Sequence, residues 1–184
     1  MRNISIICAA ALSLSSPGLV QAATFSPNTP TVKHKFEGSV QVKKNLMTPT
    51  TCWLTMEINV TGGSATVTSA ALTGAAPCGG ITFSTPPFTL NGLGSPVSLL
   101  RMDNVTTNIP AIPAFSLPAD ACFGNLFAVW QGNAASPRGI EFQDPLSDTA
   151  DTNPDNPPPS TENPCKITGV ILQTAGPGPL TITP

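Results

Sequence analysis

The chain has 184 residues, of which 40% are apolar and only 10% are charged, and its formal net charge is -2 at pH 7. The apolar fraction excludes a globally disordered chain, and the weak negative charge without a basic stripe excludes a nucleic-acid binder. The 21 prolines and 15 glycines are typical of many strands joined by loops, so the composition predicts an all-β protein.

Residues 1–22 have the pattern of a bacterial export signal. Arg2 supplies a positive start, an apolar stretch runs from Ile4 to Leu14, and Val20-Gln21-Ala22 places small residues where signal peptidase cuts. The apolar stretch is too short for a permanent membrane anchor. We therefore expect residues 23–184 to form one domain without an integral membrane segment, secreted to the extracellular space after periplasmic transit.

Two segments near the start of the mature chain alternate between apolar and polar residues. In residues 31–43 the alternation predicts a half-buried strand, and its lysine-rich polar face is also typical of a sheet edge. Residues 51–60 repeat the alternation, residues 61–64 have the glycines of a tight turn, and residues 65–72 return as a second strand. These features predict a β-hairpin over residues 51–73.

Shorter strands are expected along the rest of the chain. Pro86-Pro87 interrupts residues 81–90, which limits this segment to an edge strand or two short pieces. Residues 109–118 contain proline too often for a helix or a central strand, so they are expected to run extended across the domain. Other strands are expected within 96–109, 125–131, 139–143, 165–173 and 180–183. The pattern predicts a single antiparallel sandwich or barrel-like domain with Pro- and Gly-rich loops.

Loss of the export signal would also change the cysteine count. Cys8 would leave with the signal, and the four that remain are Cys52, Cys78, Cys122 and Cys165. An even set outside the cytosol is expected to be oxidised, and four cysteines allow three connectivities. No two of them are close in sequence, as zinc ligands normally are, so a zinc site is disfavoured.

The predicted hairpin favours the sequential pairing. If Val60 faces Ala65 across the turn, Cys52 lies opposite Thr73, a few residues before Cys78. A Cys52–Cys78 disulfide would then close the open end of the hairpin, and the remaining pair would be Cys122–Cys165.

The sequence contains no pattern typical of a catalytic site. Its single histidine, His34, lies on the inward side of the first long strand, where a structural role is favoured over a catalytic one. No Gly-x-Ser-x-Gly motif is present, and no mature cysteine is left over as a nucleophile. We therefore expect a protein that is not an enzyme and binds no organic cofactor.

Residues 144–164 form an acidic, proline-rich loop. Several of its oxygens fall at the ligand positions of an EF-hand loop, but three consecutive prolines and the lack of flanking helices argue against a true EF-hand. Two interpretations stay open: a looser, weak calcium site and a solvated loop without a bound ion. The calcium site would use Asp148, Asp151, Asp155 and Glu162.

Large apolar residues also occur where the pattern calls for polar ones. Trp53 lies on the polar face of its strand, and Phe83, Phe88, Ile112 and Phe115 lie in proline-rich segments. Such residues form an apolar contact surface when they are exposed and core when they are buried. Trp53, Phe88 and Phe115 are the candidates for the contact surface.

Several short motifs are shared with a known family. They are Phe25-Ser26-Pro27, Gly38 and Lys44 in the first strand, Thr51-Cys52, Val67-Thr68-Ser69-Ala70, Cys78-Gly79, Pro86-Pro87 before Phe88, and the late cysteines Cys122 and Cys165. Over most of the mature chain the sequence resembles the PraB-type secreted proteins, called activators of alkane oxidation. The resemblance implies an extracellular protein that aids access to oil rather than oxidising it, and it brings no catalytic residues. The proline-rich segment 109–118 and the acidic insert 144–164 are unusual for that family.

Two functions are therefore expected as alternatives. The first is a secreted, non-enzymatic accessory protein that assists growth on alkanes at the cell surface or an oil-water interface, with an apolar surface as its partner. The second is a subunit of an extracellular fibre or biofilm matrix. In that case residues 23–44 would form an arm that adds as a strand to another copy, with its lysines meeting the acidic loop. A carbohydrate or adhesion module is supported by the β architecture alone, and a fold does not establish a function.

Overall fold

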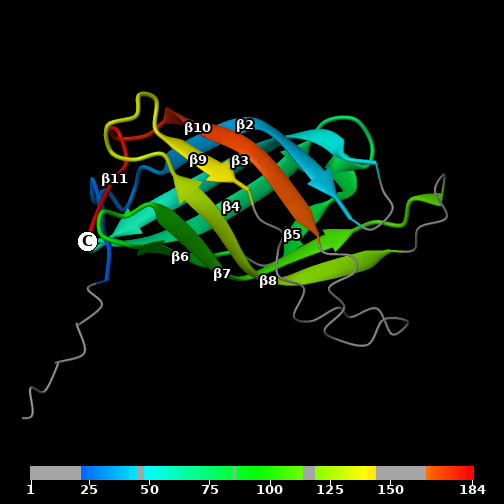
Figure 1. Ribbon diagram of the computed structural model, residues 1–184, viewed down its shortest axis with the longest axis horizontal. Coiled ribbons are helices and arrows are strands. Elements are labelled where there is room, and N and C mark those ends of the chain that lie inside the picture. Colours follow the sequence, from blue (N-terminus) through cyan, green and yellow to red (C-terminus); the bar gives the residue numbers. More distant parts are fainter. Residues whose placement is uncertain (1–21, 45–47, 85, 114–118, 144–164) are drawn as a thin grey trace, which may run out of the picture.

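The computed structural model describes residues 22–44, 48–84, 86–113, 119–143 and 165–184, and strands dominate these ranges (Figure 1). The strands are β1 (Thr24–Ser26), β2 (His34–Lys43), β3 (Thr50–Thr61), β4 (Ser64–Thr73), β5 (Thr82–Ser84), β6 (Phe88–Leu93), β7 (Leu99–Ile109), β8 (Asp120–Trp130), β9 (Gly139–Phe142), β10 (Lys166–Ala175) and β11 (Thr181–Thr183). One 3-10 turn, η1 (Cys78–Gly80), joins β4 to β5. The predicted all-β fold is confirmed.

The strands close into an eight-stranded antiparallel barrel. Its order is β3, β2, β10, β9, β8, β7, then β5 and β6, then β4, which pairs again with β3. β5 and β6 share one position, because β5 pairs with Ala71 near one end of β4 and β6 pairs with Ala65 near the other. Pro86-Pro87 lies between them, so the segment forms two short strands, as a residue without an N–H donor requires.

β2 is an interior strand of this barrel, with β3 on one side and β10 on the other. Its inward residues His34, Phe36 and Val40 are buried, which confirms the predicted alternation. The edge position that its lysines indicated is wrong, because both of its sides are paired. At Gly38 an added Cβ would collide with the carbonyl oxygen of Val170, so glycine lets β10 approach closely.

The predicted β3–β4 hairpin is confirmed, with one difference in register. Thr73 faces Trp53, whereas the sequence placed it opposite Cys52. The shift arises at a β-bulge that follows Glu57, where the Thr68 hydroxyl donates to the Glu57 carbonyl oxygen at 3.4 Å. A bulge adds one unpaired residue to one strand, so every pair beyond it moves by one position.

Side chains fill the interior of the barrel. The rings of Phe36 and Trp130 meet edge to face with centroids 6.5 Å apart. A void between described inward residues of β3, β6 and β7 has a volume of about 10 Å³, which holds at most a single water molecule. Around this void the described core residues are packed and leave no room for an alkyl chain.

A small sheet of β1 and β11 covers one end of the barrel (Figure 1). Its inward residues Phe25 and Ile182 are buried. The Phe25 N–H donates to the Gly63 carbonyl oxygen at 2.8 Å, and the Asn133 side chain bonds both backbone groups of Ile182 at 2.8 and 3.0 Å. The opposite end carries η1 and both disulfides, and we call it the disulfide end.

Candidate functional site

Trp53 projects from the outer face of β3 and stays 49% exposed. Its register partners are Ser39 on β2 and Thr73 on β4, and its outward neighbours along β3 are Thr51 and Thr55. These short polar side chains are too small to cover an indole ring. The structure therefore leaves Trp53 open to solvent, where the sequence placed it.

The other aromatic candidates do not join Trp53 on the surface. Phe88 is only 5% exposed because it starts β6 and points into the core, so its assignment to an exposed contact surface is wrong. Phe83 is partly buried and packs against the same core. Phe115 lies outside the described residues. Ile112 lies at the disulfide end, where it lines a cleft.

This cleft lies between the turn that follows β4 and the segment that follows β7. Its volume is about 580 Å³. It is lined on one side by Gly74, Ala76, Pro77, Gly79 and Gly80, and on the other by Pro110, Ala111, Ile112 and Pro113. Gly74 directly follows Thr73, the register partner of Trp53, so the cleft begins one residue beyond the exposed indole.

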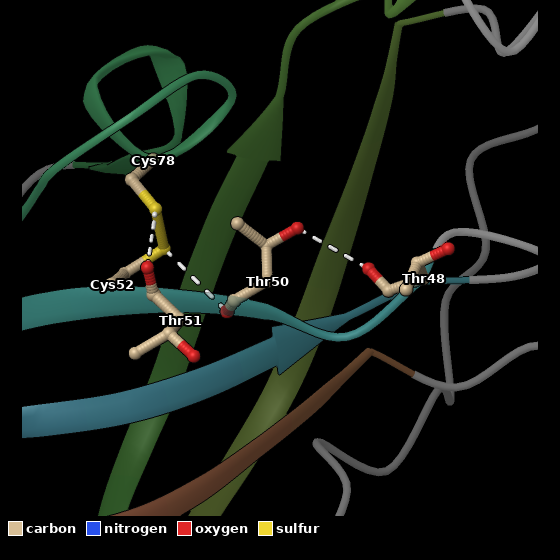
Figure 2. The surroundings of a disulfide bond; sticks show 5 residues. All are labelled: Thr48, Thr50, Thr51, Cys52 and Cys78. Atoms are coloured by element: carbon tan, nitrogen blue, oxygen red, sulfur yellow. Dashed lines mark hydrogen bonds between the residues drawn. A yellow bond between two sulfur atoms is a disulfide. The ribbon is translucent and has the colours of Figure 1, made fainter.

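The turn side of the cleft is held in place by covalent and packing contacts. The disulfide Cys52–Cys78 ties η1 to β3 with a Cα–Cα distance of 5.5 Å, and Cys78 Sγ lies 3.4 Å from the Thr51 carbonyl oxygen (Figure 2). The two walls also meet, because a Cβ on Gly80 would lie 2.8 Å from Pro110 Cγ. Only glycine permits this approach.

The lining of the cleft presents little hydrogen-bonding capacity. None of its side chains is charged or polar, and three of the nine lining residues are prolines, which have no N–H. On the turn side, the Gly80 N–H already donates to the Pro77 carbonyl oxygen at 2.9 Å. A polar ligand that left water for this cleft would therefore find no side-chain hydrogen-bond partner there.

Both predicted disulfides are present. The second, Cys122–Cys165, joins the start of β8 to the residue before β10, with a Cα–Cα distance of 6.2 Å. Disulfides of this kind form in oxidising compartments, which fits an extracellular or periplasmic protein. Within the described ranges, no helix has the length and apolarity that crossing a lipid bilayer would need.

His34 is fully buried near the capped end, away from the cleft. Its Nδ1 lies 3.2 Å from Gln173 Nε2, and burial lowers the pKa of its imidazole, an effect that backbone contacts with Pro27 and Gly178 offset in part. A buried imidazole in this position organises the cap and has no access to a substrate. Its inward direction follows from the alternation of β2, as predicted.

Two lysines near the start of β2 form ion pairs with carboxylates of the barrel. Lys33 Nζ lies 2.8 Å from Glu57 Oε2, and Lys35 Nζ lies 2.8 Å from Glu37 Oε1. Two of the lysines assigned to contacts with the acidic loop thus meet carboxylates of their own barrel. No cluster of metal-ligating side chains occurs in the part of the chain that the structure describes. Asp148, Asp151, Asp155 and Glu162, the calcium candidates, lie outside it.

Sequence reasoning missed the cleft because its walls are distant in the chain. The sequence predicts that residues 109–118, which include Ile112, run extended across the domain, but it does not indicate which segment they meet. The available signal is that both segments are rich in glycine, alanine and proline, which leaves an apolar surface with few large side chains to fill it. Their meeting depends on β5, which pairs with both β4 and β7.

Comparison with known proteins agrees with the resemblance seen in the sequence. A family model described as "Alkane oxidation protein activator PraA/PraB-like" matches residues 1–179. No curated protein and no solved structure matches the chain significantly. Because the family match spans nearly the whole sequence, the chain belongs to the PraA/PraB-like family of alkane oxidation protein activators.

Proposed function

We propose that this protein is an exported, non-enzymatic accessory protein that assists growth on alkanes by contacting oil at the cell surface or at an oil-water interface. The family description names alkane oxidation. The two disulfides support an extracytosolic location. The described residues support a binding role, because the only histidine is buried and four cysteines are consumed in disulfides.

The packed interior of the barrel carries this proposal. Barrels that transport apolar molecules hold them in a central cavity, whereas the void here is only about 10 Å³. For this reason we place the contact with an alkane on the outside of the barrel. There Trp53 is 49% exposed on a face of short polar residues, beside the apolar disulfide end.

Replacing Trp53 by threonine, the residue type of its neighbours on β3, tests the proposal. If roughly half of an indole enters the oil, the loss is about 1–2 kcal/mol, or roughly five- to thirtyfold in partition to a hexadecane-water interface. Trp53→Phe is the matched control, because it keeps an apolar ring at the same position. We expect Trp53→Phe to retain most of the partition.

Tryptophan fluorescence reports the same contact directly. The chain has two tryptophans, and Trp130 is only 3% exposed. A blue shift of the emission on adding a hexadecane emulsion therefore reports Trp53. Unchanged partition of Trp53→Thr together with an unshifted emission of the native protein would refute the proposed contact.

The fibre alternative requires more than a free arm. Residues 34–43 form β2, which is paired on both sides, and residues 24–26 pair with β11. To add as a strand to another copy, the whole arm 23–44 would have to leave its own barrel and open it. For this reason we propose the interface function in preference to fibre assembly.

A further inference from the structure

We propose that the cleft at the disulfide end binds one saturated aliphatic chain. The inference rests on the proposed function and deepens it by naming a place and a ligand class. Trp53 on the outer face of β3 would bind the protein to the oil surface, and the cleft would bind a single alkyl chain. The argument comes from the lining, the shape and the surroundings of the cleft.

The lining selects the chemical class of the ligand. Its nine residues are glycine, alanine, proline and isoleucine, without a charged, hydroxyl or amide side chain. Sugars, phosphates and carboxylates would find no side-chain partner there. Proline-rich peptides are recognised by aromatic-lined grooves, and no aromatic residue lines this cleft. An aliphatic chain is the ligand that loses nothing on leaving water, because it has no hydrogen bonds to give up.

The size and rigidity of the cleft suit a small ligand. Its volume of about 580 Å³ falls within the usual range for small-molecule sites, roughly 300–1,000 Å³. Its turn side is fixed by the Cys52–Cys78 disulfide and by the contact between Gly80 and Pro110. Because such a site is already formed before the ligand binds, little conformational entropy is lost in ordering its walls.

Gly79 is the position from which the cleft can be blocked. An added Cβ there meets nothing within 4 Å, and the backbone has no positive φ that would strain a larger residue. Gly80 behaves differently, because its Cβ would strike Pro110. Because Gly79 lines the cleft, a large side chain there has open space beside the cleft wall and does not require the backbone to move.

The experiment uses 1-octanol as a water-soluble saturated chain and follows backbone amide and methyl NMR signals of the protein expressed with its export signal. We expect saturable shifts centred on Gly79, Gly80, Ala111 and Ile112, with one chain bound per protein. Benzyl alcohol serves as the aromatic probe of similar polarity. We expect it to bind clearly more weakly, because the cleft has no ring for it to stack on.

Two phenylalanine variants form a matched pair. Gly79→Phe fills the cleft and should weaken octanol binding by at least about tenfold. Ala75→Phe adds the same ring in the same turn, at an exposed position that does not line the cleft, and should bind within about twofold of the native protein. If Gly79→Phe fails to fold, Ile112→Ser offers a second test by removing the largest apolar side chain of the lining.

The outcomes separate this inference from the proposed function. Octanol shifts elsewhere on the barrel, or equal binding by native protein and Gly79→Phe, would overturn the cleft assignment even if Trp53→Thr still lost its partition to hexadecane. Conversely, Trp53→Thr should bind octanol like the native protein, because Trp53 does not line the cleft. If octanol binds in the cleft but Trp53→Thr partitions to hexadecane like the native protein, the cleft is supported as an alkyl-chain site and the interface role of Trp53 is overturned.

Discussion

His34 shows how one buried side chain joins distant parts of the chain. Through Gln173 it is linked to the segment that leads into β11, because Gln173 Nε2 donates to the Gly178 carbonyl oxygen at 2.7 Å and Gln173 Oε1 accepts from the Leu180 N–H at 2.8 Å. The imidazole therefore supports the cap over the barrel in its neutral form. Protonation would place a charge among buried groups that are suited to a neutral ring.

This arrangement predicts a pH dependence of stability. Burial lowers the folded pKa of His34 below its ordinary value of 6.5, so the unfolded chain binds more protons in the pH range just below that value. The free energy of unfolding should therefore be constant above about pH 7.5 and fall as the pH drops through about 6.5 towards 5.5. Urea unfolding monitored by circular dichroism at several pH values measures it.

The variant His34→Gln supplies the control, because a glutamine keeps a polar contact with Gln173 but does not titrate. Its stability should be flat over the same interval. Glu37 does not interfere, because hydrogen bonds from Lys35 and Thr174 lower the pKa of its carboxyl, and its contribution is lost only at more acidic pH. A native protein whose stability did not change between these pH values would contradict a buried neutral imidazole.

At the level of the elements, local sequence patterns predict where strands lie in the chain, but they do not predict which strands pair with each other. Alternation identified β2 and the β3–β4 hairpin, because a half-buried strand must place apolar residues on one face. The same alternation cannot tell an edge strand from an interior one, which is why β2 was misplaced at an edge. Phe88 was misjudged for a related reason, because the prolines before it indicate a loop but do not show that β6 continues into the core.

The register shift in the hairpin has a similar origin. A bulge changes the register without changing the alternation on either side, so no pattern in the sequence announces the extra residue at Thr68. The predicted Cys52–Cys78 disulfide is confirmed despite this register shift, because a shift of one position still leaves Cys52 within reach of the turn that carries Cys78. The cleft could not be predicted, since it depends on β5 bringing residues 74–80 against residues 110–113.

The two disulfides should contribute alike to stability but differently to the cleft. They close segments with sequence separations of 26 and 43, so each is worth about 3–4 kcal/mol in the free energy of unfolding. The double variant Cys52→Ala/Cys78→Ala also releases the turn wall, so octanol binding should weaken. Cys122→Ala/Cys165→Ala removes residues that do not line the cleft, and octanol should still bind. Isothermal denaturation and the NMR titration give the two readouts.

Equal loss of octanol binding in both disulfide variants would indicate that the cleft depends on the stability of the whole barrel. Retained binding in both would indicate that its walls need no covalent anchor. Either result would contradict the specific role given to the Cys52–Cys78 bridge.

For the whole molecule, closure of the barrel limits the ways in which it can recognise a partner or a ligand. Pairing of β4 with β3 closes the ladder at that seam, so main-chain addition of a strand between them is disfavoured. The void between the described core residues of β3, β6 and β7, about 10 Å³, is too small to bind an alkyl chain. What remains for recognition is the outer surface, where Trp53 and the apolar cleft lie at neighbouring positions.

Hydrogen exchange of β2 distinguishes this closed barrel from a chain with a free arm. Because β2 is paired with β3 and β10 over most of its length, its ladder amides should open only when the barrel itself unfolds. We expect protection of at least about a thousandfold over an unstructured peptide, similar to that of β3. The short β1, which pairs with β11 over three residues, should exchange faster because it frays without opening the barrel. If residues 34–43 of the purified monomer exchanged as fast as an unstructured peptide, β2 would be free to join another copy, and fibre assembly would replace the interface function as the better account of the protein.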